Sequence, residues 1–244
     1  MPLQHITLPT QDGTCPAALA SPAQPRAAHP GVILYMDAFG PRPALYDMAK
    51  RLADNGYFVL VPDLYYRVGD YGTFDAKTAF ADEETGKRLR GIMAETKQAL
   101  TERDGAGFIA ALTEAGAAGK IGTVGYCMGG ARALIAAAAY PERIAAAASF
   151  HGGNLASDAP DSPHLHAATI KARVYAGSAG VDGSFPPEQS ARLALALREA
   201  EVDHTLENYV GMGHGWAVSD HRVYDPAGAE RHWTRLLTLF DETL

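Results

Sequence analysis

Cysteine is scarce in this chain, whose 244 residues include only Cys15 and Cys127. The two do not form a C-x-x-C pair, and no His/Cys cluster has the spacing of a metal site. No G-x-G-x-x-G sequence follows a predicted strand, so the sequence calls for neither a metal nor a nucleotide cofactor. A disulfide would occupy the Cys127 sulfur, which lies in the motif described below. We therefore expect both cysteines to be free thiols.

Long apolar runs and concentrated positive charge are also missing. No stretch approaches the roughly 18 apolar residues needed to cross a bilayer, and residues 1–10 lack the charged-then-apolar pattern of a signal peptide. The net charge of −7 comes without a basic cluster, which argues against nucleic acid or an anionic membrane as partner. These absences predict a cytoplasmic protein with a small-molecule partner, present as a monomer or a homodimer.

No Pro/Ser-rich linker divides the chain, so we expect a single domain over residues 1–244. Residues 5–8 and 17–20 predict two short antiparallel strands at the start of the chain, followed by a polar, Pro-rich connection through Pro30. Further strands are predicted at 32–36, 57–61, 120–124, 145–150, 174–177 and 205–209, and helices at 45–52, 92–115, 131–138, 190–200 and 227–240. This alternation predicts a mostly parallel α/β sheet with helices on both faces. In such sheets the ligand crevice lies beyond the carboxyl ends of the strands.

The pentapeptide Gly-Tyr-Cys-Met-Gly at 125–129 lies between a predicted strand and a predicted helix. A sharp turn between two buried elements requires small residues two before and two after its centre, and both are glycine. The positive end of the helix dipole favours a thiolate at Cys127, and the N–H of Met128 can stabilise an oxyanion. The pattern is typical of a nucleophile elbow. The alternative is a chance match around an inert buried cysteine.

A cysteine nucleophile needs a base, and the base needs an orienting acid. His214 follows the last predicted strand, and glycines on both sides allow a tight loop that returns the imidazole to the elbow. The other histidines are placed less favourably, before the sheet, in polar loops, at a strand start or downstream: His5, His29, His164, His166, His204, His221 and His232.

Asp182 is the candidate acid, because it follows the strand at 174–177 by a short loop. The order Cys127, Asp182, His214 is the nucleophile–acid–base order of α/β-hydrolases. Asp158 and Asp161, after the preceding strand, are its rivals, and a solvated turn aspartate is the alternative reading.

Three motifs together resemble the dienelactone hydrolase family of α/β-hydrolases: Gly-Tyr-Cys-Met-Gly-Gly at 125–130, the Asp182 loop that ends in Phe-Pro, and Gly-Met-Gly-His-Gly-Trp at 211–216. The resemblance runs from about Ile33 onward. It implies an α/β-hydrolase core of about eight strands without a large cap. It also implies hydrolysis of an ester or lactone through an acyl-cysteine, with no cofactor and with Ala38 N–H as the second oxyanion donor.

The sequence departs from the family at two places. Characterised members have a glutamate where this chain has Asp37, and that glutamate contacts and activates the resting cysteine. The shorter Asp37 either keeps this role or positions the Ala38 loop. Members that bind dienelactone also carry an arginine shortly after the catalytic histidine, where this chain has Trp-Ala-Val at 216–218. Without it we expect a more apolar pocket, unless Arg88 or Arg90 supplies a cation.

Several aromatic residues and one histidine are candidates for substrate contact because they follow predicted strands: Phe39, Tyr65, Tyr66, His151 and Trp216. Each has an alternative as core packing or loop hydrogen bonding. At the level of function, the same site could serve simple carboxylesters, thioesters or organophosphates. Weaker alternatives are a non-catalytic ligand-binding protein and a redox sensor that uses Cys127.

Overall fold

The computed structural model describes residues 3–23 and 28–244. The predicted connection through Pro30 therefore lies partly outside the described residues. The strands are β1 (Leu3–Thr10), β2 (Gly13–Ala20), β3 (Gly31–Tyr35), β4 (Phe58–Pro62), β5 (Ile121–Tyr126), β6 (Ile144–Phe150), β7 (Arg173–Val181) and β8 (His204–Gly213). The helices are α1 (Pro43–Asp54), α2 (Glu83–Glu95), α3 (Gln98–Glu114), α4 (Met128–Ala139), α5 (Pro187–Glu199) and α6 (Pro226–Thr243), with short 3₁₀ turns at Tyr66–Val68 and Pro163–Thr169.

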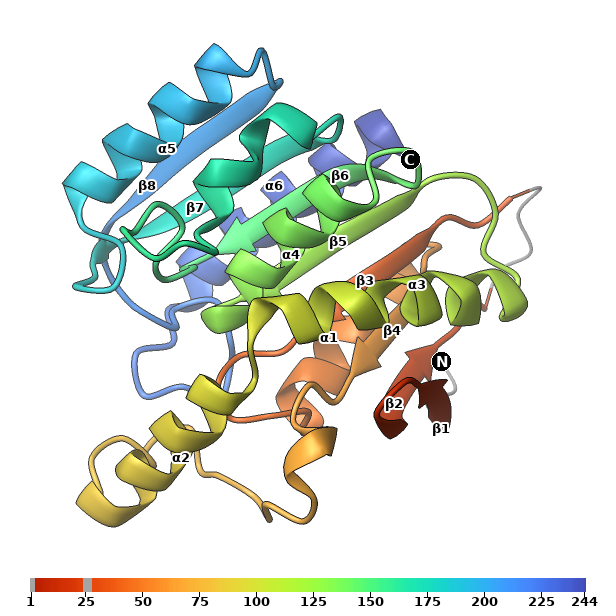
Figure 1. The fold of residues 1–244 in the computed structure, drawn as a ribbon, viewed down its shortest axis with the longest axis horizontal. Coiled ribbons are helices and arrows are strands. Elements are labelled where there is room, and N and C mark those ends of the chain that lie inside the picture. The colour runs from red at the N-terminus through yellow and green to blue at the C-terminus, as the bar shows by residue number, and fades with distance from the viewer. Residues whose placement is uncertain (1–2, 24–27) are drawn as a thin grey trace.

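All eight strands form one sheet in the order β1-β2-β4-β3-β5-β6-β7-β8. The β1–β2 and β2–β4 pairs are antiparallel, and the remaining pairs are parallel. Helices α3, α4 and α5 cover one face, whereas α1 and α6 cover the other (Figure 1). The predicted mostly parallel sheet, with antiparallel strands at the start of the chain, is confirmed.

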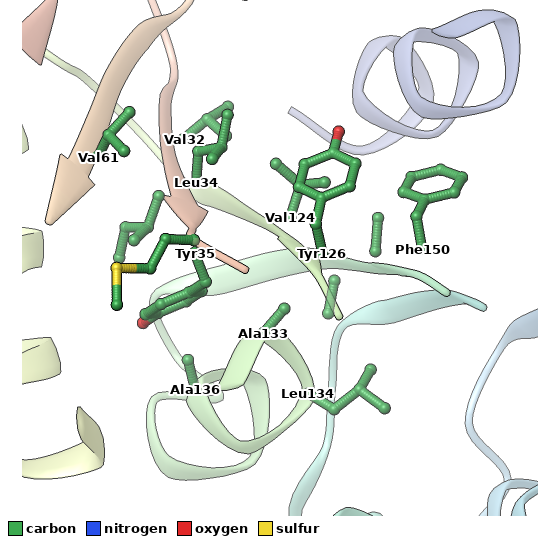
Figure 2. Packing of buried hydrophobic residues seen from close by; sticks show 14 of the residues in the cluster. Val32, Leu34, Tyr35, Val61, Val124, Tyr126, Ala133, Leu134, Ala136 and Phe150 are labelled. Carbon is green, nitrogen blue, oxygen red and sulfur yellow. The ribbon is translucent and has the colours of Figure 1, made fainter. Parts of the chain in front are cut away.

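Both faces of the central strands are apolar, as a sheet covered by helices on two sides requires. Leu34 and Tyr35 are neighbours in β3 and point to opposite faces of the sheet (Figure 2). Tyr126 and Phe150 stack at a centroid distance of 5.9 Å. On the other face, Ala133 of α4 is fully buried. Its small side chain allows the helix that follows the elbow to pack closely on β5.

The helical stretch predicted around residues 92–115 is present, and the structure divides it between the end of α2 and the whole of α3. Helix α2 ends at Glu95, and Thr96 Oγ1 donates a hydrogen bond to the Ile92 carbonyl at 2.9 Å. This side-chain bond satisfies a terminal carbonyl and helps to end the helix. Helix α2 extends away from the carboxyl edge of the sheet, beyond the other helices (Figure 1).

In residues 3–23 and 28–244, no helix is both long enough and apolar enough to span a membrane.

Candidate active site

Cys127 lies at the turn between β5 and α4, with φ 55° and ψ −121°. A positive φ is uncommon for a residue other than glycine, and strain of this kind is a feature of nucleophile elbows. A Cβ on Gly125 would lie 1.9 Å from the Gly129 carbonyl oxygen, and a Cβ on Gly129 would lie 2.4 Å from that of Tyr35. Only glycine fits at these two positions. The predicted strand–turn–helix around Cys127 is confirmed.

His214 follows β8 directly, and Asp182 follows β7 directly. Because β7 and β8 are parallel neighbours, the two side chains meet at the same edge of the sheet. His214 Nδ1 donates a hydrogen bond to Asp182 Oδ2 at 2.7 Å. Burial would raise the pKa of Asp182, but hydrogen bonds from His214 and Ser184 hold it below its ordinary value. This carboxylate stays ionised and fixes the imidazole.

The His214 imidazole also interacts with the Cys127 side chain. Burial alone would lower the pKa of His214, but hydrogen bonds to Asp182 and Cys127, together with their negative charges, raise it to about 10. Asp182 and Cys127 therefore both favour the protonated form of His214. The structure brings together all three residues of the predicted triad.

Ser184 is a member of this cluster that the sequence reasoning missed. Its N–H and Oγ–H donate to Asp182 Oδ1 at 2.8 and 2.7 Å, and its Oγ lies 3.3 Å from His214 Nδ1. The signal was present in the sequence, because Asp-Gly-Ser favours a turn in which the aspartate accepts from the residue two positions on. Ser184 thus leaves the second carboxylate oxygen free for His214.

The loop after β3 carries Ala38, which is fully buried. The Tyr65 hydroxyl donates to the Ala38 carbonyl at 2.8 Å, and the Phe39 N–H donates to Asp37 Oδ1 at 3.0 Å. No acceptor for the Ala38 N–H is found in the described part of the chain. Met128 is the first residue of α4, where backbone N–H groups have no partner within the helix. Among the described residues, neither N–H group has an acceptor outside the helix, which is compatible with the predicted role of both as oxyanion donors.

Asp37 is fully buried and held by an ion-pair network. Arg42 donates to both of its oxygens at 2.7 and 2.9 Å, and His221 Nε2 donates to Oδ2 at 2.9 Å. Burial would raise the pKa of Asp37, but His221 and Arg42 lower it. Asp37 thus shares its oxygens with these two side chains and with the Phe39 N–H. Of the two roles open to Asp37, the contacts favour positioning the Ala38 loop over activating Cys127.

Arg42 links two loops that are far apart in the sequence. Besides Asp37, it binds Asp220 through Nε and Nη2 at 2.6 and 2.8 Å. Asp220 follows the His214 loop, so one guanidinium joins the segment that carries Ala38 to the segment that carries the imidazole. Neither Arg42 nor Asp220 was a candidate from the sequence, because only the folded chain brings them together.

Replacing Arg42 with glutamine should lower the free energy of unfolding by about 3 kcal/mol, because Asp37 then keeps a buried charge without its main partner. Displacement of the Ala38 loop should also reduce kcat for esters on the order of tenfold or more. Urea denaturation and steady-state kinetics measure both effects. Arg51→Gln is the matched control, because Arg51 pairs with Glu230 through two hydrogen bonds on the exposed surface and should matter much less. Equal losses in the two variants would contradict this role of Arg42.

Of the residues predicted to contact the substrate, some line the cavity and others are buried in the core. A cavity of about 970 Å³ opens at Cys127 and His214, and Phe39 lines it. Trp216 does not line the cavity, because it is fully buried and stacks on Tyr209 at 4.5 Å. Tyr65 and Tyr66 are likewise absent from the wall, as are Arg88 and Arg90. The expectation that Trp216, Tyr65 and Tyr66 could form a substrate wall is corrected accordingly.

His151 contacts the elbow and does not line the cavity. It is fully buried, and its Nδ1 accepts a hydrogen bond from the Cys127 N–H at 3.2 Å. Burial and the nearby histidines His214 and His221 lower its pKa well below the ordinary value, so the ring is neutral. Its ring packs edge to face on that of His214, with the ring centroids 5.2 Å apart. These contacts suit a positioning role rather than the predicted contact with a substrate.

Both cysteines are free thiols, as expected. Cys15 is buried, and burial raises its pKa to about 12, so it is unreactive. In the residues that the structure covers, no group of His, Cys, Asp and Glu side chains has the arrangement of a metal site.

Comparisons with known proteins identify the family of the chain. The model of the dienelactone hydrolase family matches residues 15–244. A protein of Escherichia coli O157:H7, provisionally named carboxymethylenebutenolidase, is 30% identical over 241 residues, which cover 97% of this chain and 85% of that protein. The carboxymethylenebutenolidase of Rhodococcus opacus is 26% identical over 236 residues, which cover 95% and 88% of the two chains.

Solved structures show the same fold. A provisionally assigned dienelactone hydrolase of Klebsiella pneumoniae superimposes with a TM-score of 0.87 at 23% identity, covering 98% of both chains. A dienelactone hydrolase-like promiscuous phosphotriesterase from metagenomic libraries superimposes with a TM-score of 0.79 at 25% identity, covering 99% of this chain and 98% of that one. The fold is that of an α/β-hydrolase without a large cap, and the chain belongs to the dienelactone hydrolase family.

Proposed function

We propose that this protein hydrolyses an ester or lactone through a Cys127–His214–Asp182 triad and a covalent acyl-cysteine. The observation that carries the proposal is the position of His214, which is held by Asp182 at 2.7 Å and interacts with the sulfur at the elbow. The three groups face a cavity large enough for a small organic substrate. This arrangement supplies a nucleophile, a proton carrier and an orienting carboxylate.

The proposed cycle begins with the Cys127 thiolate beside the His214 imidazolium. The sulfur attacks the substrate carbonyl, and the N–H groups of Met128 and Ala38 stabilise the oxyanion. As the carbonyl re-forms, the C–O bond to the leaving group breaks and His214 protonates the leaving oxygen. An acyl-thioester on Cys127 remains beside a neutral imidazole.

Deacylation reverses these roles. The neutral His214 takes a proton from water, and the resulting hydroxide attacks the thioester. Collapse of the second tetrahedral intermediate releases the carboxylic acid and restores the thiolate–imidazolium pair. Asp182 stabilises the imidazolium in each step at which it forms. The cycle uses only protein groups and water.

The acyl-enzyme provides the direct test. Brief mixing with p-nitrophenyl acetate, followed by acid quenching, should give protein heavier by one acetyl group, with the label on the peptide that contains Cys127. Cys15 is the internal control, because its buried thiol should remain unlabelled. An ester hydrolysed at full rate with no label on Cys127, or with the label on another residue, would refute the covalent route.

A second activity is favoured by one relative. The 25% identical structure named a promiscuous phosphotriesterase covers nearly the whole chain. The Cys127 thiolate could attack phosphorus in an activated organophosphate as it attacks a carbonyl carbon. Comparison of initial rates on paraoxon, p-nitrophenyl esters, thioesters and dienelactone would rank these substrate classes, and Cys127→Ala would show which rates depend on the triad.

A further inference from the structure

His151 has a backbone conformation that is costly for a histidine. Its φ is 39°, and in the described chain the other residues besides glycine with a positive φ are Cys127, Asn154 and Glu201. Such conformations persist where the surrounding structure holds them, and they cluster at functional sites. The Cys127 N–H donates a hydrogen bond to His151 Nδ1 at 3.2 Å. The strained turn that carries the nucleophile thus contacts a second strained residue, which follows the neighbouring strand β6.

The side chain of His151 carries a further cost. Its Nδ1 accepts a hydrogen bond, so the proton of the neutral ring is on Nε2, which is buried without a hydrogen-bond partner among the described residues. An unsatisfied buried donor destabilises the folded state. A leucine would avoid this cost, and an asparagine or a glycine would adopt the positive φ more easily. Stability alone therefore does not account for a histidine at this position.

The His151 ring lies where three segments of the proposed site meet. Its Nδ1 contacts the elbow, and its centroid lies 5.2 Å from that of the His214 ring and 6.2 Å from that of the His221 ring. His221 in turn binds Asp37 at 2.9 Å, at the start of the loop that follows β3. One ring therefore contacts the turn of the nucleophile, the base and the anchor of the proposed oxyanion loop.

Two aromatic residues fix the orientation of this ring. Trp216 packs edge to face on it with the centroids 5.1 Å apart, and the Tyr126 ring lies at 5.8 Å. All three side chains are fully buried. Burial, together with the charges of His214 and His221, lowers the pKa of His151 well below its ordinary value. The ring therefore stays neutral, and its Nδ1 remains available as an acceptor.

We propose that His151 is a positioning residue, whose ring holds the Cys127 turn and the His214 imidazole in the arrangement that proton exchange requires. This inference rests on the proposed function of the triad. His151 does not line the cavity, so it acts through the elbow N–H and through its contact with the base. A small displacement of the sulfur or the imidazole lowers the rate of attack even when the substrate binds normally.

Two substitutions of similar shape separate the hydrogen bond from the ring. His151→Asn places an acceptor, Oδ1, the same number of bonds from the backbone as Nδ1 and tolerates the positive φ, but it lacks the ring. His151→Leu has a similar branch at Cγ and has neither acceptor nor ring. In His151→Asn, kcat/KM for p-nitrophenyl acetate should fall roughly three- to tenfold, as expected for a lost ring contact. In His151→Leu it should fall by roughly a further three- to tenfold, because the hydrogen bond is lost as well.

Two measurements distinguish positioning from a general loss of structure. Alkylation of Cys127 by iodoacetamide, in a Cys15→Ala background, should slow in the same order of variants, because it depends on the ionised sulfur and not on acyl transfer. The inhibition constant of p-nitroacetanilide, an amide analogue of the ester, should not change, because His151 does not line the cavity. If His151→Leu does not fold, His151→Gly takes its place, since glycine adopts the positive φ freely.

His232→Asn is the matched control. His232 is also fully buried, but both of its ring nitrogens have partners, the Ala229 carbonyl at 3.0 Å and the Tyr126 hydroxyl at 2.7 Å. Its replacement should lower the free energy of unfolding, measured in urea, and leave kcat/KM of the folded enzyme nearly unchanged. An equal loss of kcat/KM in His232→Asn and His151→Leu would overturn the proposal.

The remaining outcomes separate this proposal from the proposed function. If the wild type hydrolyses the ester and His151→Leu matches either His151→Asn or the wild type in kcat/KM, the positioning role of His151 is wrong and the triad stands. If the wild type hydrolyses no p-nitrophenyl ester, the proposed function fails. The alkylation rates then still decide the role of His151 at the elbow, because an unchanged rate in His151→Leu overturns it and a slower rate supports it.

Discussion

Replacing Cys127 with alanine should reduce ester hydrolysis by at least about 10⁴-fold, since the variant lacks the atom that forms the acyl bond. His214 and Asp182 would remain paired, but no nucleophile would lie beside the imidazole. The oxyanion N–H groups and the cavity would still bind the substrate, so the residual rate should reflect binding and polarisation alone. Initial rates on p-nitrophenyl esters, measured against the rate in buffer, test this expectation.

Cys15→Ala is the matched control for this experiment. Its thiol donates weakly to the carbonyls of Pro16 and Asp63 and lies outside the cavity. Its removal should leave esterase turnover intact, whereas a redox sensor that needed both thiols would lose its response. Substantial esterase activity in Cys127→Ala would contradict the proposed mechanism, and equal losses in the two variants would point to a structural effect.

Asp182→Asn should reduce kcat/KM by roughly 10³- to 10⁴-fold. An amide in place of the carboxylate can donate an N–H to His214 Nδ1, which favours the tautomer with its proton on Nε2 instead of Nδ1. It also removes the negative charge that stabilises the imidazolium in acylation and deacylation. Asp158→Asn is the control, because Asp158 is the rival from the sequence, and its side chain is 94% exposed.

The pH dependence of kcat/KM distinguishes loss of the Asp182 charge from misfolding of the Asp182→Asn variant, because misfolding would not shift the pKa of His214. Asp182 raises the pKa of His214, so the imidazolium persists until the pH rises through about 10. Loss of Asp182 removes part of this stabilisation, and the His214 pKa should fall. The basic limb of kcat/KM against pH should therefore move to lower pH in Asp182→Asn. A limb that stays in place, or moves upward, would contradict the assignment.

The elbow turn and the meeting of the proposed triad residues were predictable because they depend on local rules. Glycines at 125 and 129 are required by a close approach of two backbones, and parallel neighbouring strands bring Asp182 and His214 to one edge. Both requirements appear directly as residue types and spacings in the sequence. The Asp182–Ser184 turn obeys a local rule as well and was overlooked.

The ion-pair network around Asp37 could not be predicted in this way. Its members Arg42 and His221 lie 179 positions apart, and their meeting depends on the whole sheet being formed. The wrong prediction for Trp216 has the same cause. Its position after a strand suggested that it lines the crevice, whereas the folded loop places its ring against Tyr209.

The backbone at residue 127 also restricts which nucleophiles the turn can hold. With φ at 55°, a β-branched residue such as threonine would meet severe crowding, whereas serine has the same shape as cysteine with oxygen in place of sulfur. The backbone conformation therefore excludes β-branched side chains but accepts either sulfur or oxygen as the nucleophilic atom. A lineage with this fold can exchange a thiol for an alcohol through one substitution, without rebuilding the scaffold around it.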